Sequence, residues 1–321
     1  MPQPSDRLSA LLHIGYHKTG TNWLQRHLFG NPQTGLHWVG KSGGDHPVRQ
    51  LVNARPLEFE AAASRSLFEP LLEEARSAGL VPVVSYERFS GHPFSGGYDS
   101  KEIAERLREV FPAAKVLVVI REQRSIILST YKQYVKAGGP LPLARFVSPP
   151  TSRSQRVPWF DLRHFEYDHL INHYRSVFGE DSVLALPFEQ FVREPPAFVT
   201  AIGDFAGRPL SAELLETLPY GARSNSALTA IEVAVKRRQN RLLKRSEVNP
   251  APVFESPPLR RLTRVVLSAP IEALIPKRVA ERNETALCEE VAALVGDRYR
   301  KSNRVTAELT GLDLASFGWP V

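Results

Sequence analysis

The stretch from residue 10 to residue 29 constrains this chain more than any other. Its apolar run at residues 11–14 is typical of a short buried strand. Gly15 and Gly20 then allow a tight turn and a close approach of the backbone to a ligand, and apolar residues after Asn22 recur at helical spacing. A strand, a loop and a helix N-terminus in this order predict an anion site, because exposed N–H groups and the helix dipole attract negative charge.

The loop differs in residue order from the P-loop of nucleotide triphosphatases, Gly-x-x-x-x-Gly-Lys-Ser/Thr. Lys18 precedes Thr19-Gly20-Thr21 instead of following the glycine. The best later strand runs into Arg121, where such enzymes carry a magnesium-binding aspartate. An arginine at this strand end indicates a second phosphate contact, and we predict no catalytic metal.

These two features resemble the sulfotransferases that use 3′-phosphoadenosine 5′-phosphosulfate (PAPS). Their first loop, Lys-Ser/Thr-Gly-Thr-Thr/Ser-x, grips the 5′-phosphosulfate. Here it reads Lys18-Thr19-Gly20-Thr21-Asn22-Trp23. Their second signature is an arginine that ends a core strand and a serine eight residues later, as Arg121 and Ser129 are here. The resemblance implies that Arg121 and Ser129 hold the 3′-phosphate.

Weaker similarity extends toward the C-terminus and is closest in kind to bacterial carbohydrate and small-molecule sulfotransferases. It covers residues 183–191, the segment Arg223-Ser224-Asn225-Ser226 and residues 299–314. It implies a nucleotide contact by Arg223. Two residues depart from the family pattern: Asn22 replaces a hydroxyl residue, although its amide can still donate to a phosphate oxygen, and Phe188 replaces a frequent tyrosine.

Strand and helix patterns alternate along the chain. We expect strands at Leu11–Gly15, Val81–Tyr86, Val116–Arg121 and Val183–Pro187. We expect helices at Asn22–Phe29, Glu58–Ala78, Ser100–Val110, Ser125–Lys136, Asp168–Val177, Pro196–Phe205 and Thr285–Tyr299. This order predicts an α/β fold with a parallel sheet and helices on both faces. The resemblance makes it the P-loop nucleotide-kinase-like fold of sulfotransferases.

Length and composition fit one domain over residues 1–321. We expect an irregular loop near 138–158 and a basic, mostly helical C-terminal region at 228–321. A single cysteine, Cys288, favours a reducing compartment, and neither an apolar signal segment nor a membrane-spanning run is evident. We therefore expect a cytoplasmic protein. Its oligomeric state and any peripheral membrane contact are left open.

The formal net charge of +7 suits a doubly phosphorylated nucleotide. Nucleic acid is an unfavoured partner, because the basic residues are mostly scattered and accompany no nucleic-acid-binding motif.

Sulfuryl transfer needs alignment and stabilisation of the leaving phosphate. Lys18 suits the second task, because an ammonium group follows charge as it develops. The resemblance assigns backbone N–H contacts to Gly20, Thr21, Asn22 and Trp23, and hydroxyl contacts to Thr19 and Thr21. The indole of Trp23 has two interpretations, stacking on adenine or packing in the core.

An acceptor hydroxyl needs a general base. Glu87 follows the second expected strand, where cytosolic members of the family carry a catalytic histidine and several carbohydrate enzymes use a glutamate. The alternative is that Glu87 only pairs with Arg88 or Lys18. His17 is the rival base, or a residue that shapes the loop.

The sequence thus predicts a PAPS-dependent sulfotransferase that sulfates a hydroxyl, foremost of a carbohydrate or glycolipid, and releases adenosine 3′,5′-bisphosphate. A small natural product or a lipid alcohol is the other acceptor class. The competing functions are an ATP-dependent P-loop kinase and a non-catalytic protein of the same fold that binds nucleotides or polyanions.

Overall fold

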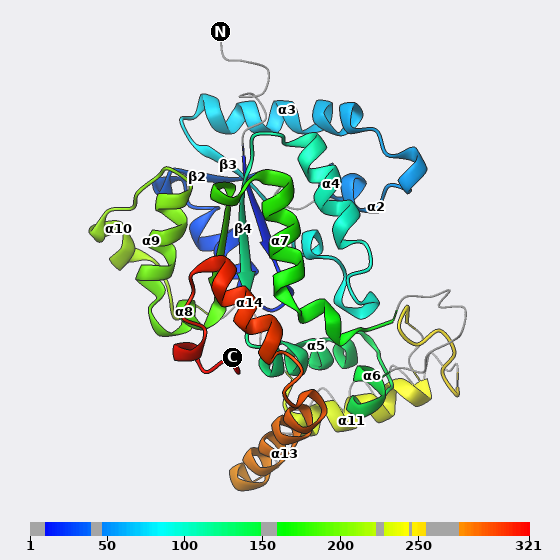
Figure 1. The fold of residues 1–321 in the computed structure, drawn as a ribbon. Helices are drawn as coiled ribbons and strands as arrows, with labels where there is room; N and C mark the ends of the chain where they lie inside the picture. The colour runs from blue at the N-terminus through cyan, green and yellow to red at the C-terminus, as the bar shows by residue number, and fades with distance from the viewer. Residues whose placement is uncertain (1–9, 40–46, 149–158, 223–227, 244–245, 255–275) are drawn as a thin grey trace. The chain divides into compact units, whose positions relative to one another are not determined.

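A computed structural model describes residues 10–39, 47–148, 159–222, 228–243, 246–254 and 276–321 (Figure 1). The chain divides into two compact units. The first comprises Met1–Glu122, Arg163–Ser224 and Tyr299–Val321, and the second comprises Gln123–Leu162 and Asn225–Arg298. We describe the two units separately. A single domain over residues 1–321 stays a prediction.

A five-stranded parallel sheet forms the centre of the first unit (Figure 1). Its strands are β1 (Leu11–Gly15), β2 (Leu36–Val39), β3 (Val81–Ser85), β4 (Lys115–Ile120) and β5 (Val183–Pro187). They lie in the order β2-β3-β1-β4-β5, with Leu11 of β1 opposite Val83 of β3 and Lys115 of β4. Parallel neighbours require crossover connections, which the intervening helices provide. The expected parallel α/β fold is confirmed.

Both faces of the sheet are covered, as the sequence of the strands requires. Side chains alternate between the faces along a strand, yet Leu11, Leu12 and Ile14 are all buried. Leu11 belongs to a core cluster that includes Leu24 of the first helical segment and Ile202 of α9 (Pro195–Phe205). On the other face α7 (Tyr167–Phe178) packs against β4 and β5 (Figure 1).

Further helices complete the first unit. The helical segment after β1 consists of α1 (Thr21–Trp23) and a π-helical turn at Leu24–Leu28. The remaining helices are α2 (Pro47–Asn53), α3 (Ala61–Ser77), α4 (Ser100–Val110), α8 (Phe188–Arg193), α10 (Ala212–Thr217) and α14 (Arg300–Thr310). A 3-10 turn, Glu87–Ser90, follows β3 and contacts β1.

The described part of the second unit is helical. It contains α5 (Gln123–Ala137), α6 (Leu143–Val147), α11 (Ala230–Leu243) and α13 (Lys277–Val295). The buried Asn240 of α11 donates hydrogen bonds to the carbonyls of Val135 and Gly139, and Lys132 of α5 pairs with Glu284 of α13. These polar contacts join α11 and α13 to α5.

The observed sheet has one strand that the sequence did not predict, and two of the expected strands have slightly different ends. β2 was not predicted, because its four residues include His37 and Trp38 and show no clear apolar run. The expected Val81–Tyr86 and Val116–Arg121 become β3 and β4 with ends moved by one residue.

The helix boundaries differ more. The expected helix at Thr285–Tyr299 lies mostly within α13, which begins earlier at Lys277 and ends before Gly296, whose φ is +54°. The expected loop near 138–158 contains α6, and its residues 149–158 lie outside the described part of the chain. In the described ranges, no helix has the length and apolar character needed to cross a bilayer.

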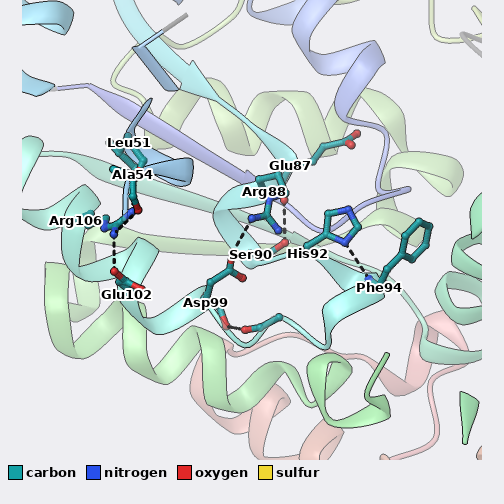
Figure 2. Close-up of polar contacts among 12 residues, drawn as sticks. Leu51, Ala54, Glu87, Arg88, Ser90, His92, Phe94, Asp99, Glu102 and Arg106 are labelled. Atoms are coloured by element: carbon teal, nitrogen blue, oxygen red, sulfur yellow. Dashed lines mark hydrogen bonds and ion pairs between the residues drawn. The ribbon is translucent and has the colours of Figure 1, made fainter. Parts of the chain in front are cut away.

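A buried arginine joins two helices beside the sheet. Arg106 of α4 is only 5% exposed. Its guanidinium donates to the carbonyls of Leu51 and Ala54 at the C-terminal end of α2, at 2.8 and 2.9 Å, and contacts the Glu102 carboxylate at 2.5 Å (Figure 2). Helix C-termini leave carbonyls without intrahelical partners, so this arginine satisfies groups that burial would otherwise penalise.

We expect Arg106→Leu to lower the free energy of unfolding by about 2–4 kcal/mol, because it removes several hydrogen bonds and leaves buried carbonyls unpaired. Urea unfolding measures the change. The matched control is Lys101→Leu on the same helix, where the side chain is 76% exposed in its pair with Glu105. Its expected cost is below about 0.5 kcal/mol. Equal losses in the two variants would contradict the role of Arg106.

Candidate functional site

The loop between β1 and α1 has an unusual backbone. Lys18 has a φ of +73° and is the only non-glycine residue with a positive φ in the described part of the chain. Gly20 follows with a φ of +81°. A side chain in this left-handed region costs roughly 1–3 kcal/mol and persists only where surrounding contacts enforce it. The strain therefore identifies the loop as a candidate functional site.

The loop presents amide donors for which the described part of the chain provides no acceptor. The hydroxyl of Thr19 donates to the carbonyl of Tyr16 at 2.6 Å and holds the turn closed. The amides of Thr19, Gly20, Thr21 and Asn22 donate to no other residue of the described chain. Consecutive N–H groups at a turn and a helix N-terminus form a cradle for an oxyanion.

The backbone amide and the indole of Trp23, for which we expected nucleotide contacts, bind other groups of the protein. Its amide donates to the carbonyl of Gly20 at 2.9 Å. Its indole is 4% exposed, stacks on Tyr220 and donates through Nε1 to the carbonyl of Pro219 at 3.0 Å. The core interpretation of this residue therefore describes the structure, and both the amide and the ring are engaged within the protein.

A second unusual feature is a buried hydroxyl at the end of the loop, where α1 begins. The hydroxyl of Thr21 is buried and has no hydrogen-bond partner in the structure. A Cβ on Gly15 would lie 2.6 Å from this oxygen and 3.2 Å from both Thr19 Oγ1 and His13 Nε2, so only glycine fits here. Buried polar atoms without partners are rare and expensive. The Thr21 hydroxyl is thus suited to a ligand above the loop.

His13 is a fully buried histidine on β1, the strand that leads into the loop. Its Nδ1 lies 2.7 Å from the hydroxyl of Ser85 on β3, and Gln25 donates to the same oxygen at 3.0 Å. Burial lowers the pKa of His13 to about 3, so the ring is neutral at physiological pH. It adds no charge beneath the proposed anion site.

Arg121 connects the end of β4 to the loop. Its Nη1 donates to the carbonyl of Lys18 at 2.8 Å, which places the two cationic residues at one edge of the sheet. The guanidinium lies over the ring of Phe188, 5.0 Å from its centroid. A Cβ on Gly20 would lie 3.1 Å from the same ring. Phe188 thus packs against both the loop and the arginine through apolar contacts.

Glu87 begins the 3-10 turn after β3 and is directed away from Arg88 (Figure 2). Arg88 instead pairs with Asp99 at 2.7 Å, so the alternative in which Glu87 pairs with Arg88 does not describe the structure. Glu87 Oε2 lies 3.8 Å from His17 Nε2. The expected carboxylate and the expected histidine are therefore neighbours.

Burial shifts the pKa values of Glu87 and His17 in opposite senses. It raises the pKa of Glu87, and the nearby Lys18 partly opposes that rise. It lowers the pKa of His17 to about 3, with added repulsion from His92, His164, Arg88 and Lys18. His17 is therefore neutral at physiological pH. Its contact with Glu87 is a polar contact of an uncharged ring and not an ion pair.

Two predicted cofactor contacts are not tested by the described structure of the first unit. Ser129 is half-buried on α5, which belongs to the second unit, and its pairing with Arg121 stays a prediction. Arg223 lies outside the described residues. No group of three or more His, Cys, Asp or Glu side chains is arranged to hold a metal ion in the described ranges. The absence of a catalytic metal stays a prediction.

Sequence reasoning missed the aromatic and imidazole groups around His17. The ring of His92 lies 5.7 Å from that of His17, and His164 lies 5.0 Å from the ring of Tyr16. A Cβ on Gly97 would lie 2.2 Å from His164 Nδ1, so the glycine permits this close packing. Gly91, Gly96 and Gly97, which lie close to His92 in the sequence, were the only local sign of this close packing. The ring contacts themselves join segments that are far apart in the sequence.

A sequence model described as the sulfotransferase family matches residues 11–212, which is more than half of the chain. The match runs from β1 through β5 and contains Lys18, Glu87 and Arg121. No curated protein sequence matches the chain.

Several solved structures are similar to this chain. A sulfotransferase from Alicyclobacillus acidocaldarius has a TM-score of 0.46 and 19% identity, over 74% of this chain and 95% of that chain. The sulfotransferase domain of the Synechococcus PCC 7002 olefin synthase has a TM-score of 0.42 and 13% identity, over 72% and 94%. Mouse sulfotransferase SULT7A1, complexed with PAP, has a TM-score of 0.36 and 12% identity, over 81% and 83%.

The two loop threonines provide a matched test of the site geometry. We expect Thr19→Val to lower the free energy of unfolding by about 1–2 kcal/mol, because the Tyr16 carbonyl loses its donor. Thr21→Val should be neutral or slightly stabilising, because it removes a buried hydroxyl that has no partner. Urea unfolding of both variants gives the comparison. A loss at Thr21 as large as that at Thr19 would show that the Thr21 hydroxyl is satisfied within the protein.

Proposed function

The chain belongs to the sulfotransferase family, and we propose that it moves the sulfuryl group of PAPS to an acceptor hydroxyl and releases adenosine 3′,5′-bisphosphate. The acceptor that we propose first is a carbohydrate or glycolipid, with a small natural product or lipid alcohol as the alternative. The observation that carries the proposal is the loop itself, where unused amides, the orphaned Thr21 hydroxyl and a strained lysine converge.

The loop fits the phosphosulfate end of this donor, which supplies the sulfuryl group. The amides of Gly20, Thr21 and Asn22 have no acceptor in the described chain and can therefore donate to an oxyanion, as can the Thr21 hydroxyl. Asn22 adds a side-chain amide where a hydroxyl is usual. Lys18 is the residue that we assign to the leaving phosphate, because a fixed cation there stabilises negative charge as it accumulates.

Arg121 is our candidate for the 3′-phosphate. A guanidinium binds phosphate through parallel N–H bonds and has several donors, so holding the Lys18 carbonyl is compatible with holding an anion. Its place at the end of β4 follows the rule that ligands bind at the carboxyl ends of parallel strands. Ser129 and Arg223 remain proposed partners from the family resemblance.

Glu87 is favoured over His17 as the general base. A base works best when its pKa approaches the working pH. Burial moves the pKa of Glu87 upward, toward that range, whereas it moves the pKa of His17 down to about 3. We therefore assign proton removal to the Glu87 carboxylate, and positioning of that carboxylate or of the acceptor to the neutral imidazole of His17.

Two other functions compete with this proposal. A kinase of the P-loop type would bind ATP with magnesium, but the Lys-Thr-Gly-Thr order of the loop and Arg121 at the end of β4 count against it. A non-catalytic nucleotide-binding protein would keep the loop and lack a working base. The proximity of Glu87 and His17 favours the enzyme. A cytoplasmic location, freedom from metal and a lack of nucleic-acid partners remain part of the proposal.

Calorimetric titration separates these functions. We expect adenosine 3′,5′-bisphosphate to bind more tightly than adenosine 5′-phosphate or ATP–magnesium. Arg121→Ala should weaken bisphosphate binding by about 10- to 100-fold, since charge-assisted hydrogen bonds are lost. Arg26→Ala, an exposed arginine on the first helical segment, is the control and should have little effect. Preference for ATP–magnesium would support the kinase, and equal binding of all three nucleotides would refute a 3′-phosphate site.

Glu87→Gln tests the base. We expect turnover to fall by about 100-fold or more, with unchanged affinity for adenosine 3′,5′-bisphosphate. In the unmodified protein the rate should rise with pH through the raised pKa of Glu87, because only the carboxylate accepts a proton. The variant should lose that rise.

Product release from PAPS, with methyl glycosides and long-chain alcohols as acceptors, provides the assay. His17→Gln is the comparison variant. A larger loss of turnover and of the pH dependence in His17→Gln than in Glu87→Gln would transfer the role of base to His17.

A further inference from the structure

The end of the chain is buried beside the candidate site. Trp319 is 3% exposed, and its ring lies 5.7 Å from that of Tyr167, whose hydroxyl donates to the backbone carbonyl of Arg121 at 2.5 Å. Asn303 of α14 is fully buried and donates to the carbonyl of Pro320 at 2.8 Å. These contacts hold the C-terminal segment against the rest of the first unit.

Trp319 donates to a carboxylate that is already bound to the end of β4. Its Nε1 lies 3.2 Å from Glu189 Oε2, and the amide of Glu122 donates to Glu189 Oε1 at 3.0 Å. Burial raises the pKa of Glu189, and the hydrogen bonds from Glu122, from its own backbone and from Trp319, with the charge of Arg121, offset only part of that rise. The N–H donors and the cation thus partly compensate the penalty that burial places on the ionised carboxylate.

The same carboxylate binds the amide of Glu122, the residue that follows Arg121, and interacts electrostatically with the Arg121 guanidinium. Burial lowers the pKa of Arg121, and Glu189 is the first of the negative groups that oppose this shift. The guanidinium carbon lies over the ring of Phe188, the neighbour of Glu189 on α8. The arginine is therefore held by this ring and by the Lys18 carbonyl, and the charge of Glu189 attracts it.

We propose that Glu189 and Trp319 are positioning residues that set the orientation of Arg121, so that the C-terminal segment determines selectivity for a 3′-phosphorylated nucleotide. The proposal rests on the proposed function of Arg121. A long, flexible side chain binds a phosphate well only when its rotamer is fixed beforehand. Trp319 supplies one of the N–H groups that hold Glu189, and Glu189 binds the backbone amide next to Arg121 and attracts its guanidinium.

Trp319→Phe removes the N–H group and keeps an aromatic ring. We expect the ratio of affinities for adenosine 3′,5′-bisphosphate and adenosine 5′-phosphate to fall by about threefold to tenfold, which corresponds to one lost hydrogen bond. Affinity for adenosine 5′-phosphate should change less, because this nucleotide lacks the 3′-phosphate that we assign to Arg121. A merely structural role would weaken both nucleotides alike and leave the ratio constant, and that result would overturn the proposal.

Two further variants make the test specific. Phe317→Leu alters the same C-terminal segment at a ring that contacts Arg193 and not Glu189, so the ratio should stay at the wild-type value. In an Arg121→Ala background the effect of Trp319→Phe on the ratio should vanish, because the two residues act in series. A fall in the ratio with Phe317→Leu, or a rise with Trp319→Phe, would overturn the proposal.

Hydrogen exchange in the nucleotide-free protein provides a readout that does not depend on the proposed function. Exchange of the Glu122 amide should accelerate in Trp319→Phe, because its acceptor Glu189 loses a restraint, and should not accelerate in Phe317→Leu. Unchanged exchange in Trp319→Phe would refute the role of Trp319. Faster exchange without any preference for the bisphosphate in the wild-type protein would instead confirm the contact and refute the assignment of Arg121.

Discussion

The hydrogen bond from Arg121 to the carbonyl of Lys18 is the contact on which the candidate site depends. It joins the end of β4 to a loop whose lysine adopts the left-handed region, a conformation that costs roughly 1–3 kcal/mol and needs external support. The loop's other supports are the Thr19–Tyr16 bond beneath it and the ring of Phe188 beside Gly20. These supports restrain the turn before any ligand binds, and such preorganisation is what an anion site requires.

Burial gives the neighbouring polar groups different chemical roles. Glu87 and His17 lie 3.8 Å apart, yet burial shifts their pKa values in opposite directions, so that one group becomes the better proton acceptor and the other stays neutral. Burial also raises the pKa of Glu189, and hydrogen bonds from Glu122 and Trp319 oppose that rise. The two carboxylates therefore differ in their partners: Glu87 lies beside a neutral imidazole, whereas Glu189 is bound by N–H donors.

Strand ends were the most predictable part of this protein. The run before Arg121 is apolar throughout and lies between Lys115 and Arg121, and the run before Gly15 is short and mostly apolar, so the strands and their parallel arrangement could be inferred. β2 was missed because its sequence lacks such a run. The first helix was expected to be regular, but it passes into a π-helical turn after Trp23. Trp23 had two interpretations, and only its contacts with Pro219 and Tyr220 distinguish them.

The sequence by itself determined the chemistry of the loop, because the order of lysine, threonine and glycine after a strand is a local property of the chain. It also placed Lys18, Glu87 and Arg121 after strands, which brings them to one sheet edge in any parallel arrangement. Only the tertiary structure decided which groups surround them. Glu189 and Trp319 are 130 residues apart in the sequence. Phe188 and Gly20 are likewise far apart in the sequence. Their contacts arise when distant segments pack together, and no local pattern encodes such packing.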